Sequence, residues 1–209
     1  MLGIHDYWLF LLAGLLLILA PGQDTMFIIG RSLTGGARSG IAAALGITVG
    51  SLCHTLAAAL GLSAVLATSA FAFSLVKLAG AAYLLYLGAR LLFASTPAVI
   101  AAPAAAAAGG ARSAFLQGIL TNILNPKVAL FFLAFLPQFI EPASTTKTLA
   151  FLALGASFVA LGSIWCLVLA IGAARLQRVF VSNPSARALL DRIVGVLFLG
   201  LGARLAWAR

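Results

Sequence analysis

Six long apolar segments dominate this chain of 209 residues, and each is long enough to cross a lipid bilayer as a helix. A crossing helix needs about 20 apolar residues, because each residue advances it by only about 1.5 Å. Continuous segments of this length favour helices over the alternating strands of a membrane barrel. We therefore expect an all-α membrane protein with six transmembrane helices, at approximately residues 7–30, 40–67, 70–93, 113–139, 148–174 and 189–207.

The composition agrees with a membrane protein, since 63% of the residues are hydrophobic and 8% are charged. In a soluble protein the net charge of +9 would indicate nucleic-acid binding. Here the basic residues mostly flank apolar segments, so they are better explained by orientation in a lipid membrane. The first segment has the apolar core of a secretory signal, but no Lys or Arg precedes it, and we interpret it as the first span.

The basic residues of the short loops predict how the chain is oriented. Cytoplasmic loops carry an excess of Lys and Arg. The loops after spans one, three and five hold eight of them: Arg31, Arg38, Arg90, Arg112, Arg175, Arg178, Arg187 and Arg192. The opposite side holds three: Lys147, Arg204 and Arg209. Both termini are therefore expected on the non-cytoplasmic side.

Two of the spans are interrupted about halfway, and this symmetry predicts the organisation of the chain. Span one breaks at Pro21-Gly22 and span four at Asn125-Pro126. We expect one transmembrane domain over 1–209, with a first three-helix repeat at 1–93, an Ala/Pro/Gly-rich linker at 94–112 and a second repeat at 113–209. Because each repeat has an odd number of spans, the two repeats must be inverted. In inverted-repeat transporters the binding site lies near the midplane, at the broken helices.

The first break carries a candidate functional residue. Pro21 removes a backbone donor and Gly22 weakens the helix further, so backbone groups are freed inside the membrane. Asp24 follows directly and is the only acidic residue deep in any span. It can cap the second half-helix, and as an intramembrane carboxylate it can also bind a substrate or a proton.

The second break repeats this pattern with the opposite charge. Asn122 and Asn125 supply amide donors and acceptors, Pro126 breaks the helix, and Lys127 brings a cation to a similar depth. A structural alternative is that Lys127 extends to the interface and that an asparagine caps the resumed helix. Four such residues together favour a functional role. If the two breaks meet at the midplane, Asp24 and Lys127 could form a pair.

The remaining candidates are weaker. Span two contains Gly36, Gly40, Gly46 and Gly50, whose expected role is close helix packing. His54 could shuttle protons, but a hydrogen-bonded packing role is equally compatible with its position.

No motif of an enzyme or a cofactor site is visible in the sequence. It contains no HExxH, nucleophile elbow, P-loop or metal-spaced cluster, so we expect no enzymatic activity, no cofactor and no metal. Cys53 and Cys166 lie in apolar segments without a CxxC, which favours small buried side chains over a disulfide.

The chain resembles the LysE/RhtB family of small bacterial amino-acid exporters, the lysine exporter and homoserine/threonine efflux group. The matching stretches are APGQDTMFIIGRSLTGGARSGIAAALGITVGS, VKLAGAAYLLYLGARLL and LTNILNPKVALFFLAFLPQF, in spans one to four. Where the family commonly has Pro-Gly-Pro, this chain has Gln23 in the third position, which adds a polar group and bears on substrate identity. By position, Pro21, Gly22 and Asp24 correspond to the first broken helix, and residues 122, 125, 126 and 127 to the second.

This resemblance implies a six-helix inner-membrane carrier that exports an amino acid or a close derivative, by exchange with protons. A zwitterionic substrate needs a cation for its carboxylate and an anion or carbonyls for its ammonium, which Lys127 and Asp24 can supply. The glycine-rich surfaces allow a homodimer without requiring one. Two alternatives stay open: a thiol-redox carrier of a related six-helix fold, which would need paired cysteines beside the breaks, and a structural scaffold that transports nothing.

Overall fold

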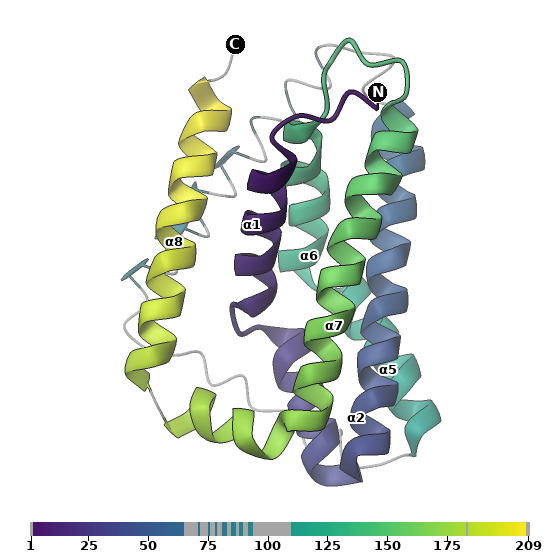
Figure 1. Cartoon of the computed structure of the whole chain (residues 1–209), viewed down its shortest axis with the longest axis vertical. Coiled ribbons are helices and arrows are strands. Elements are labelled where there is room, and N and C mark those ends of the chain that lie inside the picture. Colours follow the sequence, from purple (N-terminus) through teal and green to yellow (C-terminus); the bar gives the residue numbers. More distant parts are fainter. Residues whose placement is uncertain are drawn as a thin grey trace.

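The computed structural model describes residues 2–64, 110–182 and 184–207, together with residues 71, 75, 78, 81–82, 85–86, 88–89 and 92–93. Within these residues the fold is all-helical, and the one β-type pairing is an isolated bridge between Ile4 and Ile140. In Figure 1 the N-terminal segment and the C-terminal end of α8 (Pro184–Trp207) lie at the same end of the bundle. Most of the expected third span and most of the linker lie outside the described residues.

The first helix is interrupted where the sequence predicts. α1 (Tyr7–Leu19) has 13 residues and therefore spans only about 20 Å, less than the ~30 Å hydrocarbon core of a bilayer. Ala20 is extended, as expected before a proline, and the extended Gly22 precedes α2 (Gln23–Ala57). The second half-helix begins only at Gln23, so the predicted break at Pro21-Gly22 is confirmed.

Gly36 divides α2 into two helices and corrects one sequence-based expectation. Its φ of 72° and ψ of 177° are not helical, so residues 23–35 and 37–57 run in different directions. This φ is strained for any residue with a side chain, and a Cβ at Gly36 would have nothing within 4 Å. The expected packing role for Gly36 is therefore wrong: this glycine makes the turn between the first two spans.

The second interruption also matches its prediction. α5 (Ala111–Ile123) ends two residues before Asn125, whose side-chain Oδ1 accepts a hydrogen bond from the backbone N–H of Lys127 at 3.0 Å. Pro126 occupies the first turn of α6 (Pro126–Leu130), where a missing N–H costs nothing. The chain continues through the π-helix η3 (Phe131–Phe135) and the 3-10 helix η4 (Leu136–Phe139), bent by 46° from α5.

Among the described residues, length and hydropathy single out two membrane-crossing candidates, and a third if a bent pair of helices is counted as one span. They are Gln23–Leu62, which includes the Gly36 turn and the π-helix η1 (Ala58–Leu62), Lys147–Ala173 within α7 (Lys147–Ser182), and the bent pair Ala111–Ile123 with Pro126–Phe139. The chain is thus a helical membrane protein. The arrangement as six spans in two inverted repeats stays a prediction.

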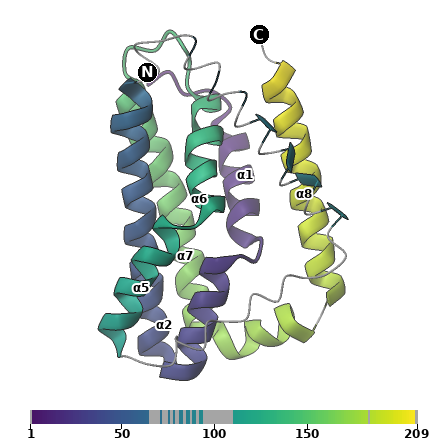
Figure 2. The same ribbon diagram turned by 180° about the vertical axis from the view of Figure 1, so that it is seen from behind.

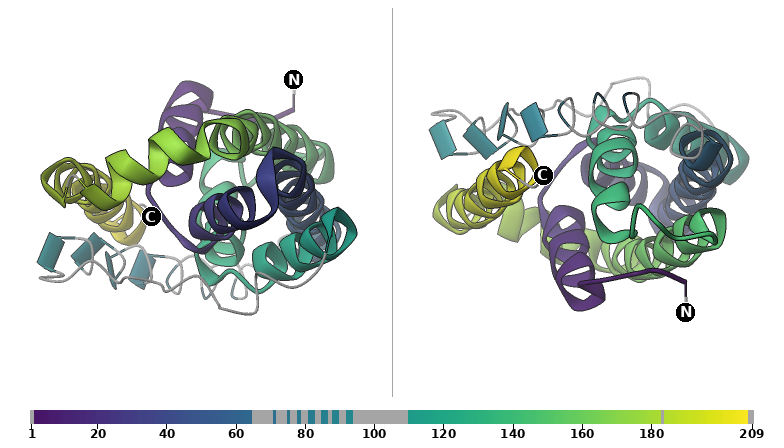
Figure 3. Two further views of the ribbon diagram at one scale, coloured as in Figure 1. Left: turned by 90° about the horizontal axis from the view of Figure 1, so that it is seen from below. Right: turned by 90° about the horizontal axis from the view of Figure 1, so that it is seen from above.

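Close approach between α2, α5 and α7 holds the bundle together. A Cβ on Gly50 would lie 2.7 Å from the Cβ of Asn122, and one on Gly118 would lie 2.6 Å from the carbonyl oxygen of Ala43. Gly40 and Gly46 are similarly enclosed, by Ser32 and by the backbone of α5. The packing role expected for Gly40, Gly46 and Gly50 is therefore confirmed. Figures 2 and 3 show α2 beside α5, with α8 at the edge of the bundle.

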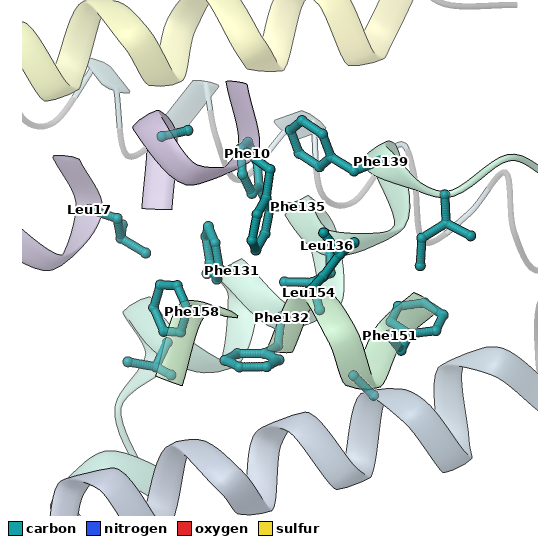
Figure 4. Close-up of a cluster of buried hydrophobic side chains, with 14 of the residues drawn as sticks. Phe10, Leu17, Phe131, Phe132, Phe135, Leu136, Phe139, Phe151, Leu154 and Phe158 are labelled. Carbon is teal, nitrogen blue, oxygen red and sulfur yellow. The ribbon is translucent and has the colours of Figure 1, made fainter. Parts of the chain in front are cut away.

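An aromatic cluster fills the half of the bundle nearer the termini. Phe10 of α1 packs on Phe131, Phe135 and Phe139, with ring centroids 5.4–6.2 Å apart. Phe158 of α7 stacks on Phe131 at 4.4 Å (Figure 4). These rings join α1, η3, η4 and α7 directly above the two breaks. The apolar faces of these segments pack against one another in a single cluster.

Candidate functional site

A cavity of about 60 Å³ lies where the two helix breaks meet. A single water needs about 10–15 Å³ on this measure, so several waters or a small solute fit. The breaks contribute Ala20, Gly22, Asp24, Asn125 and Lys127, and the remaining lining comes mainly from the facing surfaces of α1, α2, α5 and α7. Inverted breaks predicted this meeting point, and five of the nine predicted site residues line the cavity: Gly22, Asp24, Asn122, Asn125 and Lys127.

Asn122 is the centre of a buried polar network. Its Nδ2 donates to Asp24 Oδ2 at 2.8 Å, and its Oδ1 accepts from Ser51 Oγ at 3.2 Å. The Asn122 side chain is 1% exposed, so these contacts replace hydrogen bonds that water would otherwise provide. One amide therefore joins the second half of span one, span two and span four at the cavity.

The backbone of Asn122 is also bound by His54. The Nε2 of His54 lies 3.1 Å from the carbonyl oxygen of Asn122, and a carbonyl only accepts, so Nε2 carries the proton. The imidazole stacks on Phe132 with ring centroids 5.7 Å apart. His54 is not among the cavity-lining residues and supports the network from behind, which fits the packing alternative for this histidine.

Lys127 extends across the first break. Its Nζ donates to the carbonyl oxygen of Ala20 at 2.7 Å, and both Cδ and Nζ lie 3.6 Å from where a Cβ of Gly22 would be. Pro21 cannot donate to the preceding turn, so the break leaves carbonyls free for such a partner. The lysine side chain therefore passes directly over Gly22, at a distance where an added Cβ would make an ordinary van der Waals contact.

The two charges expected to work together are both at this cavity. Asp24 and Lys127 both line it, and Asn122 donates a hydrogen bond to the Asp24 side chain. The site thus brings a carboxyl group, an amine and amide groups together in a small volume. A direct functional pair between Asp24 and Lys127 stays a prediction.

The other predicted site residues have different positions. Gln23 is exposed, Pro126 is exposed at the start of α6, and Pro21 is partly exposed. None of these three is among the residues that line the cavity. Both prolines shape the site through the backbone, because each ends or begins a half-helix beside it.

Sequence reasoning missed an entire wall of the cavity. α7 contributes Phe158, Gly162, Ser163, Trp165 and Cys166, among others. Ser163 Oγ lies 3.0 Å from Thr48 Oγ1 across the interface with α2. Trp165 Nε1 is buried and meets no hydrogen-bond acceptor in the part of the chain that the structure describes. A tryptophan in mid-span, away from the usual interfacial belt, was the available sequence signal.

Arg31 corrects the sequence-based interpretation of the first loop. It was counted among the basic loop residues, but it is 1% exposed within α2. Its Nη2 donates to Gln117 Oε1 at 2.6 Å, and its guanidinium lies 5.6 Å from the centre of the Phe27 ring. Gln117 in turn donates to Ser113 Oγ at 3.0 Å. Arg31 therefore ties α2 to α5. The same two helices also meet at Asn122, about a turn and a half further along α5.

The cysteines are also placed differently from the sequence-based picture. Both are free; Cys53 is exposed on α2, whereas Cys166 is buried and lines the cavity. One sulfur atom is therefore near the breaks, which the sequence did not indicate. The pair needed by a thiol-redox carrier is missing there, because Cys53 lies on the outer surface. Among the described residues, no group of three His, Cys, Asp or Glu side chains could hold a metal ion.

Two interrupted helices that meet at a cavity lined by Asp24, Asn122 and Lys127, within a helical membrane protein, are the arrangement of membrane transporters. Residues 15–209 match the family model described as LysE type translocator, and the chain belongs to that family. The resemblance drawn from the broken-helix motifs is thereby confirmed. Membership in a family of translocators is also in line with the expectation of no enzymatic chemistry.

Several relatives match over nearly the whole chain. The leucine efflux protein of Enterobacter sp. (strain 638) is 28% identical over 207 residues, covering 98% of this chain and 96% of the relative. The leucine efflux protein of Salmonella typhimurium is 29% identical, with coverage of 98% and 96%. An uncharacterized membrane protein of Vibrio cholerae is 32% identical over 208 residues, with both chains fully covered. No solved structure matches this chain.

Proposed function

We propose that the protein exports an amino acid, or a close derivative, across the bacterial inner membrane by secondary active transport. The observation that carries this proposal is the cavity between the two breaks, where Asp24 and Lys127 provide opposite charges. Membership in the LysE type translocators and the similarity to two leucine efflux proteins support it. No nucleotide-binding motif is present in the sequence, which favours a gradient over ATP as the energy source.

The site has the chemistry that a zwitterion requires. The Lys127 ammonium suits the substrate carboxylate, and the Asp24 carboxylate suits the substrate ammonium. In the structure Lys127 Nζ binds the Ala20 carbonyl, a neutral acceptor that an incoming carboxylate can replace with a stronger, charge-assisted hydrogen bond. Asn122 donates to Asp24 Oδ2 and keeps the carboxylate in place.

Protons are the proposed coupling ion. In the proposed resting carrier Asp24 and Lys127 both carry their charges and attract each other across the cavity that they line. A proton that binds Asp24 removes this attraction and releases Lys127 to hold the substrate carboxylate, so that proton entry and export are linked. The coupling rests on the shared position of the two residues at the cavity.

The proposed topology places both termini on the non-cytoplasmic side of the inner membrane, with six spans in two inverted repeats. Two broken helices and the common end of the N-terminal segment and α8 support this arrangement (Figure 1). When the buried Arg31 is left out of the count, the loops on the proposed cytoplasmic side still hold seven basic residues, and the opposite side holds three. A homodimer stays an expectation from the glycine-rich surfaces.

Export from vesicles tests the proposal. Purified protein is reconstituted into vesicles with a panel of labelled amino acids, with and without a pH gradient. We expect gradient-dependent transport by the wild type and none by Asp24→Asn or Lys127→Met. If the two charges pair in the resting carrier as proposed, each single variant should also be less stable, because removing one partner of a buried ion pair typically costs about 3–5 kcal/mol. The double variant should regain stability without regaining transport.

Matched controls exist outside the cavity. Asp6→Asn changes an exposed carboxylate, and Lys147→Met changes a lysine whose Nζ binds the Ser144 carbonyl near the end of the bundle. Both controls should transport like the wild type. If the wild type moves no amino acid in the panel, export is the wrong function. If either single cavity variant transports with unchanged proton coupling, the charge pair is not the switch.

A further inference from the structure

One wall of the cavity, formed by residues of α1 and α7, is apolar. Leu17 and Ile18 come from the end of α1, and Phe158 and Val159 come from α7. Among the described residues, no charged side chain belongs to this part of the lining. A substrate whose polar groups are held at the breaks would therefore direct its side chain towards an apolar surface.

Gly162 belongs to this wall but contributes no side chain to it. It is one helical turn beyond Phe158 and Val159, on the same face of α7. A Cβ built at Gly162 would meet one atom within 4 Å, the Cδ1 of Ile18 at 3.8 Å, which is an ordinary van der Waals contact. The space beside Gly162 is therefore part of the cavity and is not filled by a neighbouring helix.

Neither packing nor backbone conformation requires a glycine at this position. Gly155, two turns earlier on α7, is pressed against Thr55, whose Oγ1 would be 2.8 Å from an added Cβ. Gly36 has a positive φ, but Gly162 is not among the positive-φ glycines. A glycine in the middle of a helix weakens the helix relative to alanine. What Gly162 provides here is volume in the cavity.

We propose that Gly162 is a specificity-determining residue, which leaves room between α1 and α7 for the aliphatic side chain of a neutral amino acid. This inference rests on the proposed amino-acid export. The α-carboxylate and α-ammonium groups are held by Lys127 and Asp24, and the side chain lies between Ile18 and Gly162. A charged side chain would be buried here without a partner, which is strongly unfavourable. The substrate class is therefore amino acids with aliphatic side chains, and Gly162 sets their upper size.

The test enlarges the side chain at position 162 and compares the transport of substrates of different size. Wild type, Gly162→Ala and Gly162→Val are reconstituted in vesicles, and transport of labelled leucine, alanine and lysine is measured for each. One methylene more or less in an apolar pocket changes discrimination by about 10–200-fold. We expect Gly162→Val to transport leucine at least about tenfold more slowly and alanine within about twofold of the wild type. Gly162→Ala should transport leucine at a rate between those of the wild type and Gly162→Val. Lysine should be a poor substrate for all three proteins.

Two further variants separate a size effect from a folding effect. Gly200→Val makes the same change in α8, where an added Cβ has nothing within 4 Å, and it should keep the wild-type preference. Adding Ile18→Val to Gly162→Ala removes a methyl group from the facing side chain and should restore leucine transport. Because Gly162→Ala introduces no clash, it carries the test if the valine variant does not fold.

The possible failures are distinguishable. If the wild type transports none of these or other amino acids, the proposed function is wrong and this inference falls with it. If the wild type transports leucine but the Gly162 variants slow leucine and alanine equally, Gly162 does not set substrate size. If the wild type transports lysine as well as leucine, the aliphatic class is wrong while export stands.

Discussion

The hydrogen bond between Asn122 and Asp24 should contribute measurably to stability. At 2.8 Å it joins an amide donor to a carboxylate, and Asn122 is almost completely buried. Hydrogen bonds to charged groups contribute about 1.5–3 kcal/mol in proteins, whereas polar contacts between membrane helices average about 0.6 and reach about 1.7 kcal/mol. We expect a coupling free energy of about 1–2 kcal/mol, because the acceptor is an acidic side chain in an enclosed site.

A double-mutant cycle isolates this coupling. Asp24→Ala, Asn122→Ala and the double variant are unfolded reversibly in detergent micelles, and the free energies of unfolding are compared. Loss of the Ser51 contact occurs in both variants that lack Asn122, so it cancels from the cycle.

The control for this cycle pairs Asp24→Ala with Ser144→Ala. Ser144, in the loop before α7, forms hydrogen bonds with Leu2 and Thr146 and, among the described residues, shares no hydrogen-bond partner with Asp24. These two changes should be additive within about 0.3–0.5 kcal/mol, as independent sites are. A coupling of the same small size between Asp24 and Asn122 would refute the network as a stabilising unit.

Three further outcomes are expected. Gly36→Val should lower the free energy of unfolding by about 1–3 kcal/mol, since this combination of φ and ψ is accessible essentially only to glycine; an unchanged value would mean that the turn tolerates a side chain. Arg31→Met should cost about 1.5–3 kcal/mol because a buried charged hydrogen bond is lost, while the exposed Arg38→Met should stay within about 0.5 kcal/mol; equal effects in the same unfolding assay would contradict the buried role of Arg31. The variant with Cys53→Ala and Cys166→Ala should retain transport in vesicles, because the exposed and the buried sulfur are not positioned as a redox pair, and complete loss would favour a thiol mechanism.

The sequence by itself determined the positions of the two helix breaks and the residues that meet there. Pro21, Gly22 and Pro126 act through missing donors and backbone freedom, which operate within a turn of the chain. Polar residues directly beside such breaks are expensive in a membrane unless they share a site, and Asp24, Asn122, Asn125 and Lys127 do line one cavity. The family likewise follows from these motifs, which are local in sequence.

Only the tertiary structure decided which faces of the apolar helices form the site. Arg31 has the sequence context of a loop residue, and Gly36 that of a packing glycine; their buried and turn-forming roles depend on α5 and on the path of α2. The α7 wall with Phe158, Gly162 and Trp165 was equally hidden. In a soluble helix, the contrast between apolar and polar faces would have revealed the inward side. In a membrane helix, lipid and protein core are both apolar, so the sequence carries little periodic contrast and packing between helices chooses the face.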